Sequence, residues 1–268
     1  MEQLQLGNTG VMIPEIGLGT WKYTGGTKPL RRGIELGAFL IDTAEMYKTE
    51  DAVGLAVKGI RDEVFIATKV LGSSLRYDQV MRAAEGSLRK LDVDCIDLYQ
   101  IHWSDSNVPI KETMQAMEAL VDSGQVRHIG VSNFSVKEMQ EAQAAMTNYP
   151  IVSNQVLYSL KKREIERDGL PYCQQNDITV MAYTPLGEGA LVRQPRLMPN
   201  RGAKALQQVA ADLNKTMAQV ALNWCTAHAN VIAIPKSNSI VRTEENCLAS
   251  GWRLTPEQMR MLDEAFAR

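Results

Sequence analysis

Four side chains with groups able to do chemistry, Asp42, Tyr47, Lys69 and His102, lie near the ends of apolar, strand-like segments. Those segments span residues 39–44, 64–70 and 95–102. If the segments are consecutive parallel strands, their carboxyl ends lie at one rim of a sheet, and the four side chains meet there. A carboxylate, a phenol, an ammonium and an imidazole would then share one site.

This set of groups suits the protonation of a carbonyl oxygen while a hydride is delivered to the carbonyl carbon. A free tyrosine has a pKa of about 10, and a nearby ammonium favours the phenolate. We therefore expect Lys69 to lower the pKa of Tyr47, and Asp42 to hold Lys69 charged and oriented. His102 would donate a hydrogen bond to the carbonyl oxygen, and Tyr47 would give its proton as negative charge develops there.

Each of these residues also has an ordinary structural explanation when it is taken alone. Asp42 could cap a helix, Lys69 could reach the surface, and His102 could be a hydrogen-bonded core histidine. A lysine and an aspartate inside apolar strands are costly to bury unless they pair. The meeting of all four groups at one rim therefore favours the functional interpretation.

The composition excludes several classes of protein. The chain has 268 residues, of which 45% are hydrophobic, and 29 basic against 31 acidic residues give a net charge of −2. No block of basic residues predicts a nucleic-acid-binding surface, and no run of about 18 apolar residues predicts a membrane span. The N-terminus does not have the pattern of a signal peptide. The four cysteines form no Cys-x-x-Cys pair, so we expect reduced core residues in a cytoplasmic protein.

Short apolar runs alternate with helical patterns along the chain, after an N-terminal hairpin expected within residues 1–14. The eight runs span residues 16–20, 39–44, 64–70, 95–102, 128–133, 151–156, 178–183 and 231–236. Eight strand–helix units in about 250 residues predict an α/β fold, a closed (β/α)8 TIM barrel. The alternative is a doubly wound open sheet, but Gly17-Leu-Gly19 lacks the third glycine of the nucleotide-binding motif. We expect residues 1–268 to form this one barrel domain, with a C-terminal helix.

Helix starts are marked by three capping boxes, at residues 135–138, 216–219 and 255–258. The longest irregular segment, Leu186–Asn200, is rich in Gly, Pro and Arg, and we interpret it as a lid.

No side chain in the reacting set can supply a hydride, so a cofactor must bring it. Amide and hydroxyl side chains at two strand ends suit a nicotinamide carboxamide: Ser132, Asn133, Asn154 and Gln155. Tyr183 could stack on the ring, and the turn that follows it could bind a pyrophosphate through backbone N–H groups. Lys236, Ser237 and Arg242 follow the last strand, where barrels commonly bind phosphate, and this set favours NADP(H).

The motifs together resemble those of the aldo-keto reductases, in particular small bacterial and archaeal members. The matching segments are Gly17–Trp21, Ile41–Tyr47, Thr68–Lys69, Gln100–Trp103, Gly130–Phe134, Asn154–Gln155, Tyr183–Gly187 and Ile234–Ser237. The resemblance implies Tyr47 as general acid, with Asp42, Lys69 and His102 completing the family's tetrad. It places Trp21 and Trp103 in the carbonyl pocket. For NADP(H) it implies Gly19, Thr20, Ser132, Asn133, Gln155, Tyr183, Thr184, Leu186, Gly187, Lys236, Ser237, Arg242, Glu245 and Asn246.

Some positions depart from the family's pattern. Thr184 stands where many members have Ser, and Ser104 stands where many have Pro. Because the segment after His102 is brief and the chain ends shortly after the last expected helix, we expect a shallow, open pocket with broad specificity for small carbonyl compounds. The family's habit implies a monomer.

Two other functions stay open at this stage. A cofactor-binding regulatory protein would bind NADPH but turn over negligibly. A metal-dependent barrel hydrolase or isomerase would need three ligands from adjacent strand ends, and the chain has only 3 histidines.

Overall fold

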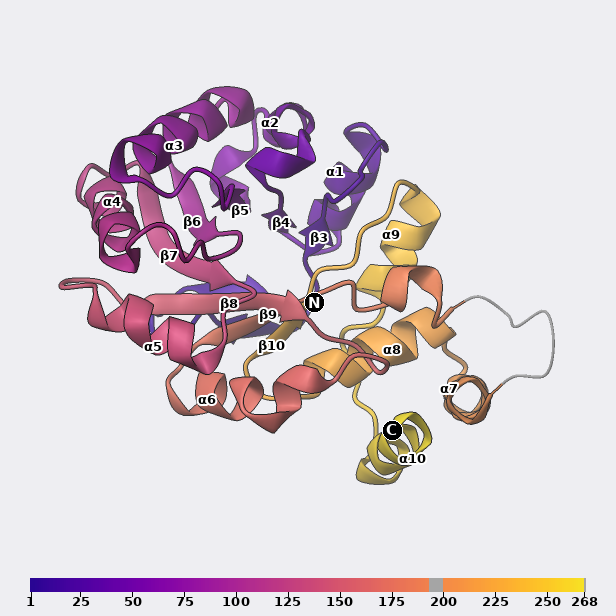
Figure 1. Cartoon of the computed structure of the whole chain (residues 1–268). Helices are drawn as coiled ribbons and strands as arrows, with labels where there is room; N and C mark the ends of the chain where they lie inside the picture. Colours follow the sequence, from indigo (N-terminus) through magenta and orange to yellow (C-terminus); the bar gives the residue numbers. More distant parts are fainter. Residues whose placement is uncertain (193–199, 268) are drawn as a thin grey trace.

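The computed structural model describes residues 1–192 and 200–267. In this part of the chain, a ring of parallel strands is surrounded by helices (Figure 1). The eight strands of the ring are β3 (Leu18–Gly19), β4 (Leu40–Asp42), β5 (Phe65–Val70), β6 (Ile96–Ile101), β7 (Val126–Ser132), β8 (Ile151–Leu157), β9 (Thr179–Tyr183) and β10 (Val231–Ala233). The predicted (β/α)8 barrel is therefore confirmed.

Helices cover the outer side of this ring. They are α1 (Lys28–Glu35), α2 (Glu50–Val57), α3 (Tyr77–Leu91), α4 (Ile110–Asp122), α5 (Val136–Ala144), α6 (Gly169–Gln175), α7 (Arg201–Asp212), α8 (Met217–Thr226), α9 (Ile240–Cys247) and α10 (Pro256–Phe266). Short 3-10 helices are η1 (Glu45–Tyr47), η2 (Arg61–Glu63), η3 (Glu164–Arg167) and η4 (Gly187–Gly189). None of the helices described here is long and apolar enough to cross a membrane.

The ring closes between its first and last strands. Ile16 bridges Ala233 and Gly19 bridges Lys236, both in parallel register. Gly19 is required at this seam, because a Cβ atom there would lie 2.6 Å from the carbonyl oxygen of Ile234. β10 is shorter than the expected 231–236, because the proline at position 235 has no N–H to extend the ladder.

The predicted N-terminal hairpin is also confirmed. β1 (Gln3–Gln5) pairs antiparallel with β2 (Met12–Pro14). Leu6 and Ile13 are fully buried in the cluster that fills the barrel interior, together with Leu40 and Phe65 at the first positions of β4 and β5. The hairpin therefore covers the amino-terminal end of the barrel, opposite the predicted site.

The three expected capping boxes are present at the N-termini of α5, α8 and α10. Reciprocal bonds of this kind satisfy donors that a helix start otherwise leaves unpaired. Other strand boundaries also differ from the expected ones: β3 and β4 are shorter than residues 16–20 and 39–44, and β7 begins at Val126, two residues before the expected start at residue 128. The exposed side chain of Arg127 interrupts the apolar pattern at the start of β7.

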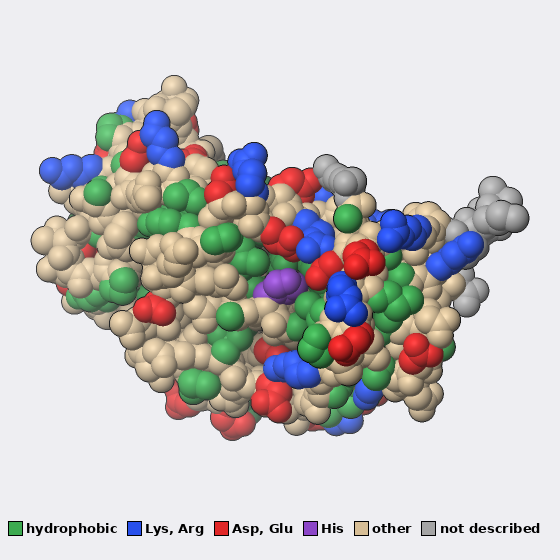
Figure 2. Space-filling view, turned by 90° about the horizontal axis from the view of Figure 1, so that it is seen from below, with side chains coloured by type: hydrophobic (Ala, Val, Ile, Leu, Met, Phe, Trp, Pro, Cys, Tyr) green, Lys and Arg blue, Asp and Glu red, His purple; other side chains and the backbone are tan. Residues whose placement is uncertain are grey.

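Three of the four cysteines are buried, and Cys95 is only partly buried, so the expected core placement holds for three of them. On the face seen in Figure 2, acidic and basic side chains lie interspersed among apolar ones. The expected lid, Leu186–Asn200, is described only in part: it begins with η4, and residues 193–199 lie outside the described part of the chain.

Candidate active site

The carboxylate of Asp42 and the ammonium of Lys69 form a buried ion pair at the carboxyl-terminal rim of the barrel. Lys69 Nζ lies 2.8 Å from Oδ1 and 2.9 Å from Oδ2 of Asp42, and it also donates to the carbonyl oxygen of Thr43 at 2.7 Å. Lys69 is fully buried and Asp42 is nearly so. Neighbouring parallel strands β4 and β5 bring the two residues together, because Asp42 is the last residue of β4 and Lys69 the penultimate residue of β5.

A third group completes the environment of the carboxylate. Gln155 in β8 reaches across the barrel, and its Nε2 donates to Asp42 Oδ1 at 2.7 Å. Burial raises the pKa of Asp42 and lowers that of Lys69, while the opposite charge of each partner acts against both shifts. The bond from Gln155 further favours the ionised carboxylate.

Tyr47 lies in η1, just beyond β4, and its ring faces this ion pair. Lys69 Nζ is 4.8 Å from the ring centroid. The phenol hydroxyl makes no hydrogen bond to any residue in the described part of the chain, which leaves it available to a bound molecule.

The expectation that Lys69 lowers the pKa of Tyr47 is wrong. Burial raises this pKa well above its ordinary value, and the negative charge of Asp42 adds to the effect. The physical reason is that Asp42 neutralises Lys69, so the ion pair presents little net positive charge to the phenol. Tyr47 therefore holds its proton at neutral pH.

His102 follows β6 directly and is almost fully buried. Its ring centroid lies 5.5 Å from that of Tyr47, in an edge-to-face arrangement. Burial lowers the pKa of His102 to about 3, and the charge of Lys69 acts in the same direction. The imidazole is therefore neutral near pH 7, and a neutral ring can still donate one N–H to an acceptor.

Two tryptophans border these groups. Trp21 packs edge-on to Tyr47 with ring centroids 5.0 Å apart, and Trp103 stacks on His102 at 4.0 Å. Their side chains are 44% and 42% exposed. They form partly open aromatic walls beside the Tyr47 hydroxyl.

Of the groups expected around a nicotinamide, Ser132, Asn133 and Gln155 lie at the ends of β7 and β8. The expectation for Asn154 is wrong, because its side chain points to the opposite face of β8 and donates to the Phe134 carbonyl oxygen at 3.0 Å. Asn133 Nδ2 donates to Ser132 Oγ at 3.1 Å and to the carbonyl of His102 at 3.2 Å. Tyr183 donates its hydroxyl proton to Asn133 Oδ1 at 3.0 Å. Asn133 adopts a left-handed conformation with φ 60°, so this network fixes its side chain toward the rim.

Of the groups expected to hold a phosphate, Lys236 and Ser237 follow β10, and Arg242 lies in α9. Lys236 and Arg242 are exposed, and neither has an ion-pair partner in the described part of the chain. The Ser237 hydroxyl donates to the Ser239 carbonyl oxygen at 2.9 Å. The two cations, which have no carboxylate partners among the described residues, are suitable donors for a phosphate group. Thr184 and Gly187 both have positive φ, at 54° and 57°, and the Gly187 N–H donates to the Thr184 carbonyl oxygen at 2.9 Å, so the chain makes a tight turn directly after β9.

The remaining predicted cofactor residues lie near β3 and β4, in α9 and directly before η4. Thr20 is buried and donates to the carbonyl oxygen of Asp42 at 2.9 Å, and Gly19 forms the barrel seam. Glu245 and the buried Asn246 lie in α9, one turn beyond Arg242. Leu186 is half-buried directly before η4.

The sequence analysis missed the polar residues that hold the Tyr47 turn. Thr49 lies between the hydroxyls of Thr20 and Thr43 at 3.0 Å from each, and Glu50 is fully buried against Thr68. The sequence does show several hydroxyl and carboxylate residues between Thr43 and Glu50, directly after an apolar run. Such residues are seldom fully buried, so their burial was not expected.

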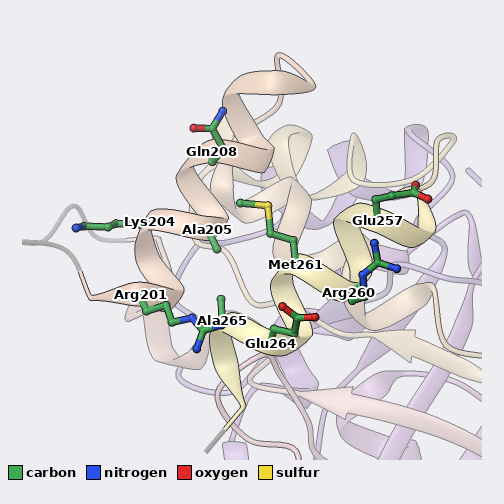
Figure 3. Close-up of a pocket in the computed structure, with 9 residues that line it drawn as sticks. All are labelled: Arg201, Lys204, Ala205, Gln208, Glu257, Arg260, Met261, Glu264 and Ala265. Atoms are coloured by element: carbon green, nitrogen blue, oxygen red, sulfur yellow. The ribbon is translucent and has the colours of Figure 1, made fainter.

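A separate hollow of about 650 Å³ lies between α7 and α10 (Figure 3). Its lining mixes charges of both signs, and none of the predicted site residues lies there. Among the described residues, no group of three or more His, Cys, Asp or Glu side chains could hold a metal ion.

Comparison with known proteins agrees with this geometry. The Aldo/keto reductase family matches residues 15–267. Methylglyoxal reductase YeaE of Escherichia coli (strain K12) is 39% identical, and the match covers 99% of this chain and 96% of that protein. A thermostable aldo-keto reductase, Tm1743, has the same fold with a TM-score of 0.91 at 37% identity, covering 99% of this chain and all of that one.

An aldo-keto reductase of Klebsiella pneumoniae, solved in complex with NADPH, has a TM-score of 0.89 at 36% identity, covering 99% of this chain and 95% of that one. Family match, sequence identity and fold agree over nearly the whole length of the chain. The chain belongs to the aldo/keto reductase family of oxidoreductases.

Proposed function

We propose that this protein reduces small aldehydes and ketones to alcohols, with NADPH as hydride donor and Tyr47 as general acid. One observation carries the proposal: the Tyr47 hydroxyl has no hydrogen-bond partner among the described residues, yet it belongs to a ring packed between Trp21 and His102. A carbonyl oxygen seated between the phenol and the imidazole could accept from both.

The proposed reaction adds one hydride and one proton to the carbonyl group. NADPH, when bound, would supply the hydride with its electron pair to the carbonyl carbon and would leave as NADP⁺. The carbonyl π electrons move to the oxygen, and His102, as a neutral donor, stabilises the developing charge there. Tyr47 transfers its proton to that oxygen. The alcohol leaves, and the phenolate regains a proton from solvent.

The raised pKa of Tyr47 is compatible with this role. A general acid must hold its proton until charge develops on the acceptor. An alkoxide is a stronger base than a phenolate, so the transfer is favourable even from a phenol with a raised pKa. The proposed part of the Asp42–Lys69 pair is to fix the Tyr47 turn and to hold a cation close to the phenolate formed.

The cofactor assignment is supported by the donor set and by the NADPH complex of the Klebsiella pneumoniae relative. We assign the 2′-phosphate to Lys236, Ser237 and Arg242. The nicotinamide site comprises Ser132, Asn133, Gln155 and Tyr183. The proposed pyrophosphate and adenosine contacts are Gly19, Thr20, Thr184, Leu186, Gly187, Glu245 and Asn246.

The substrate pocket is assigned to Trp21 and Trp103, whose partial exposure supports an open site. Such a site suits compact carbonyl compounds, including dicarbonyls like the methylglyoxal that names the Escherichia coli relative. We infer that specificity is broad, and that the protein is a one-domain monomer in the cytoplasm. The free thiols are consistent with a reducing compartment.

The test follows NADPH absorbance with a panel of small aldehydes and dicarbonyls, beside NADH and the Tyr47→Phe variant. We expect turnover that prefers NADPH and falls about 100- to 10,000-fold in Tyr47→Phe, with NADPH binding preserved. Wild-type turnover in Tyr47→Phe would remove this residue from the acid role. Tight NADPH binding without any turnover would instead support a regulatory protein, and one substrate favoured by orders of magnitude in kcat/KM would contradict broad specificity.

A further inference from the structure

The turn that carries Tyr47 is attached to the end of β5 at three points. The attachments are Thr68 Oγ1 to Glu50 Oε1 at 2.7 Å, Lys69 Nζ to the Thr43 carbonyl oxygen at 2.7 Å, and the Leu71 N–H to Glu45 Oε2 at 3.2 Å. They flank Tyr47 on both sides. The strand that carries Lys69 therefore also holds the turn that carries Tyr47.

Glu50 is the least expected of these contacts. It is the first residue of α2, its side chain is fully buried, and its hydrogen-bond partner is the buried hydroxyl of Thr68. Its other carboxylate oxygen lies 3.5 Å from Lys90 Nζ, and Lys90 is 43% exposed. The negative charge of Glu50 also acts on Lys69, whose pKa it raises against the effect of burial. Burying a carboxylate costs free energy unless strong partners compensate, although the N–H groups at the start of α2 reduce that cost.

The turn between Tyr47 and Glu50 needs such an anchor. Lys48 has φ 55°, a left-handed conformation that costs a non-glycine residue about 1 kcal/mol or more. A strained backbone persists only where surrounding contacts over-determine it. Glu50 stands two residues beyond Lys48, so its bond to Thr68 fixes the far end of the strained segment.

We propose that Glu50 is a positioning residue for the Tyr47 hydroxyl, acting through its hydrogen bond with Thr68. The proposal rests on the proposed function, because it takes Tyr47 as the proton donor. A donor misplaced by about 1 Å can cost on the order of 100-fold in rate. Glu50 itself touches neither substrate nor cofactor in this assignment.

The test compares Glu50→Ala, Glu50→Gln and Thr68→Val with the wild type. Glu50→Ala and Thr68→Val remove the contact, and we expect kcat to fall about 10- to 100-fold. Glu50→Gln keeps a carbonyl oxygen that accepts from Thr68, so kcat should return to within about threefold of wild type. The NADPH dissociation constant, measured by fluorescence without substrate, should change less than about twofold in all three.

Thr113→Val is a matched control. Thr113 in α4 is also buried and donates its hydroxyl proton to the Leu75 carbonyl oxygen at 2.8 Å, in a part of the fold that has no proposed catalytic role. It should lower the melting temperature without lowering kcat. The solvent deuterium isotope effect on kcat should rise in Glu50→Ala and Thr68→Val and stay unchanged in Thr113→Val, because only the former displace a proton donor.

A readout independent of turnover separates this proposal from the proposed function. The ¹³Cζ NMR signal of Tyr47, assigned by its loss in Tyr47→Phe, should shift in Glu50→Ala and Thr68→Val and return in Glu50→Gln. An unshifted signal with wild-type kcat in Glu50→Ala would overturn the positioning role, as would a Glu50→Gln variant as impaired as Glu50→Ala. Failure of the proposed function would instead appear as full turnover in Tyr47→Phe, or none in the wild type.

Discussion

Two buried aspartates, at opposite ends of the barrel, use their ion pairs differently. Asp42 ends β4 at the carboxyl-terminal rim, and its cationic partner Lys69 is fully buried. Asp97 is the second residue of β6 at the amino-terminal end, and its partner Arg61 keeps 24% of its side chain exposed. Arg61 also donates to two carbonyl oxygens, of Val64 and Cys95.

The two ion pairs differ in the hydrogen-bonding groups that surround them. Asp97 accepts from Arg61 at 2.7 Å and from the Ile66 N–H at 2.8 Å, and Arg127 Nε lies 3.4 Å from its other carboxylate oxygen. Asp97 therefore joins η2, β5 and β7 to β6. Asp42 and Lys69 instead border the Tyr47 phenol and the His102 imidazole, whose hydroxyl and Nδ1 have no hydrogen-bond partner among the described residues. Similar buried charges thus stabilise connections at one end of a barrel and a reactive surface at the other, in keeping with the usual placement of function in this fold.

The largest loss of stability and activity should come from breaking the Asp42–Lys69 ion pair. Lys69→Met leaves the Asp42 carboxylate buried without a cation, and removal of one partner of a buried pair typically costs about 3–5 kcal/mol. The free energy of unfolding from urea titration should fall by this amount at pH 7, and kcat should fall with it. A stable variant with full turnover would show that Lys69 is dispensable for both.

Breaking the Asp97–Arg61 ion pair should lower stability without changing catalysis. Asp97→Asn loses the charged bond to Arg61, which should lower the free energy of unfolding by about 2–3 kcal/mol. Its kcat and KM, measured on folded protein, should stay within about twofold of wild type. A loss of kcat without a loss of stability in Asp97→Asn would contradict the proposed difference between the Asp97 pair and the Asp42 pair.

A pH titration should separate the reactive rim from the rest of the fold. The pKa of His102 is lowered from its ordinary value of 6.5 to about 3, so between these pH values the unfolded chain binds a proton that the folded chain does not. The free energy of unfolding therefore falls as the pH drops through this window, by about 2 kcal/mol between pH 7 and 5. His102→Asn should lose that part of the pH dependence, and an equal slope in both proteins would place the pKa of His102 near 6.5.

The smallest effect is expected from the loss of the exposed Arg242 side chain, which should change cofactor binding and leave stability almost unchanged. Arg242→Ala should weaken NADPH binding about tenfold and NADH binding much less, because only NADPH carries the 2′-phosphate. Stability should change by less than about 0.5 kcal/mol, as is usual for exposed side chains. Equal losses for both cofactors would remove Arg242 from the phosphate site.

Much of the fold followed from the sequence, because hydrophobic periodicity and capping residues are local signals. The capping box at residues 255–258 and the hairpin of residues 1–14 are examples. The meeting of Asp42 with Lys69 followed from strand order alone. The bond from Gln155 to Asp42 did not, because it joins residues 113 positions apart across the barrel interior.

The pKa of Tyr47 was mispredicted for a related reason. The sequence placed an ammonium near the phenol but gave no measure of burial or of how fully Asp42 neutralises that ammonium. The same limit hid Glu50, which reads as an ordinary first-turn acid of a helix. Its burial depends on how closely α2 packs against β5.

The hairpin at the amino-terminal end restricts access to the barrel. Leu6 and Ile13 close that end with fully buried side chains, and the apolar cluster to which they belong fills the interior. Small molecules therefore approach Asp42, Tyr47 and His102 from the carboxyl-terminal rim.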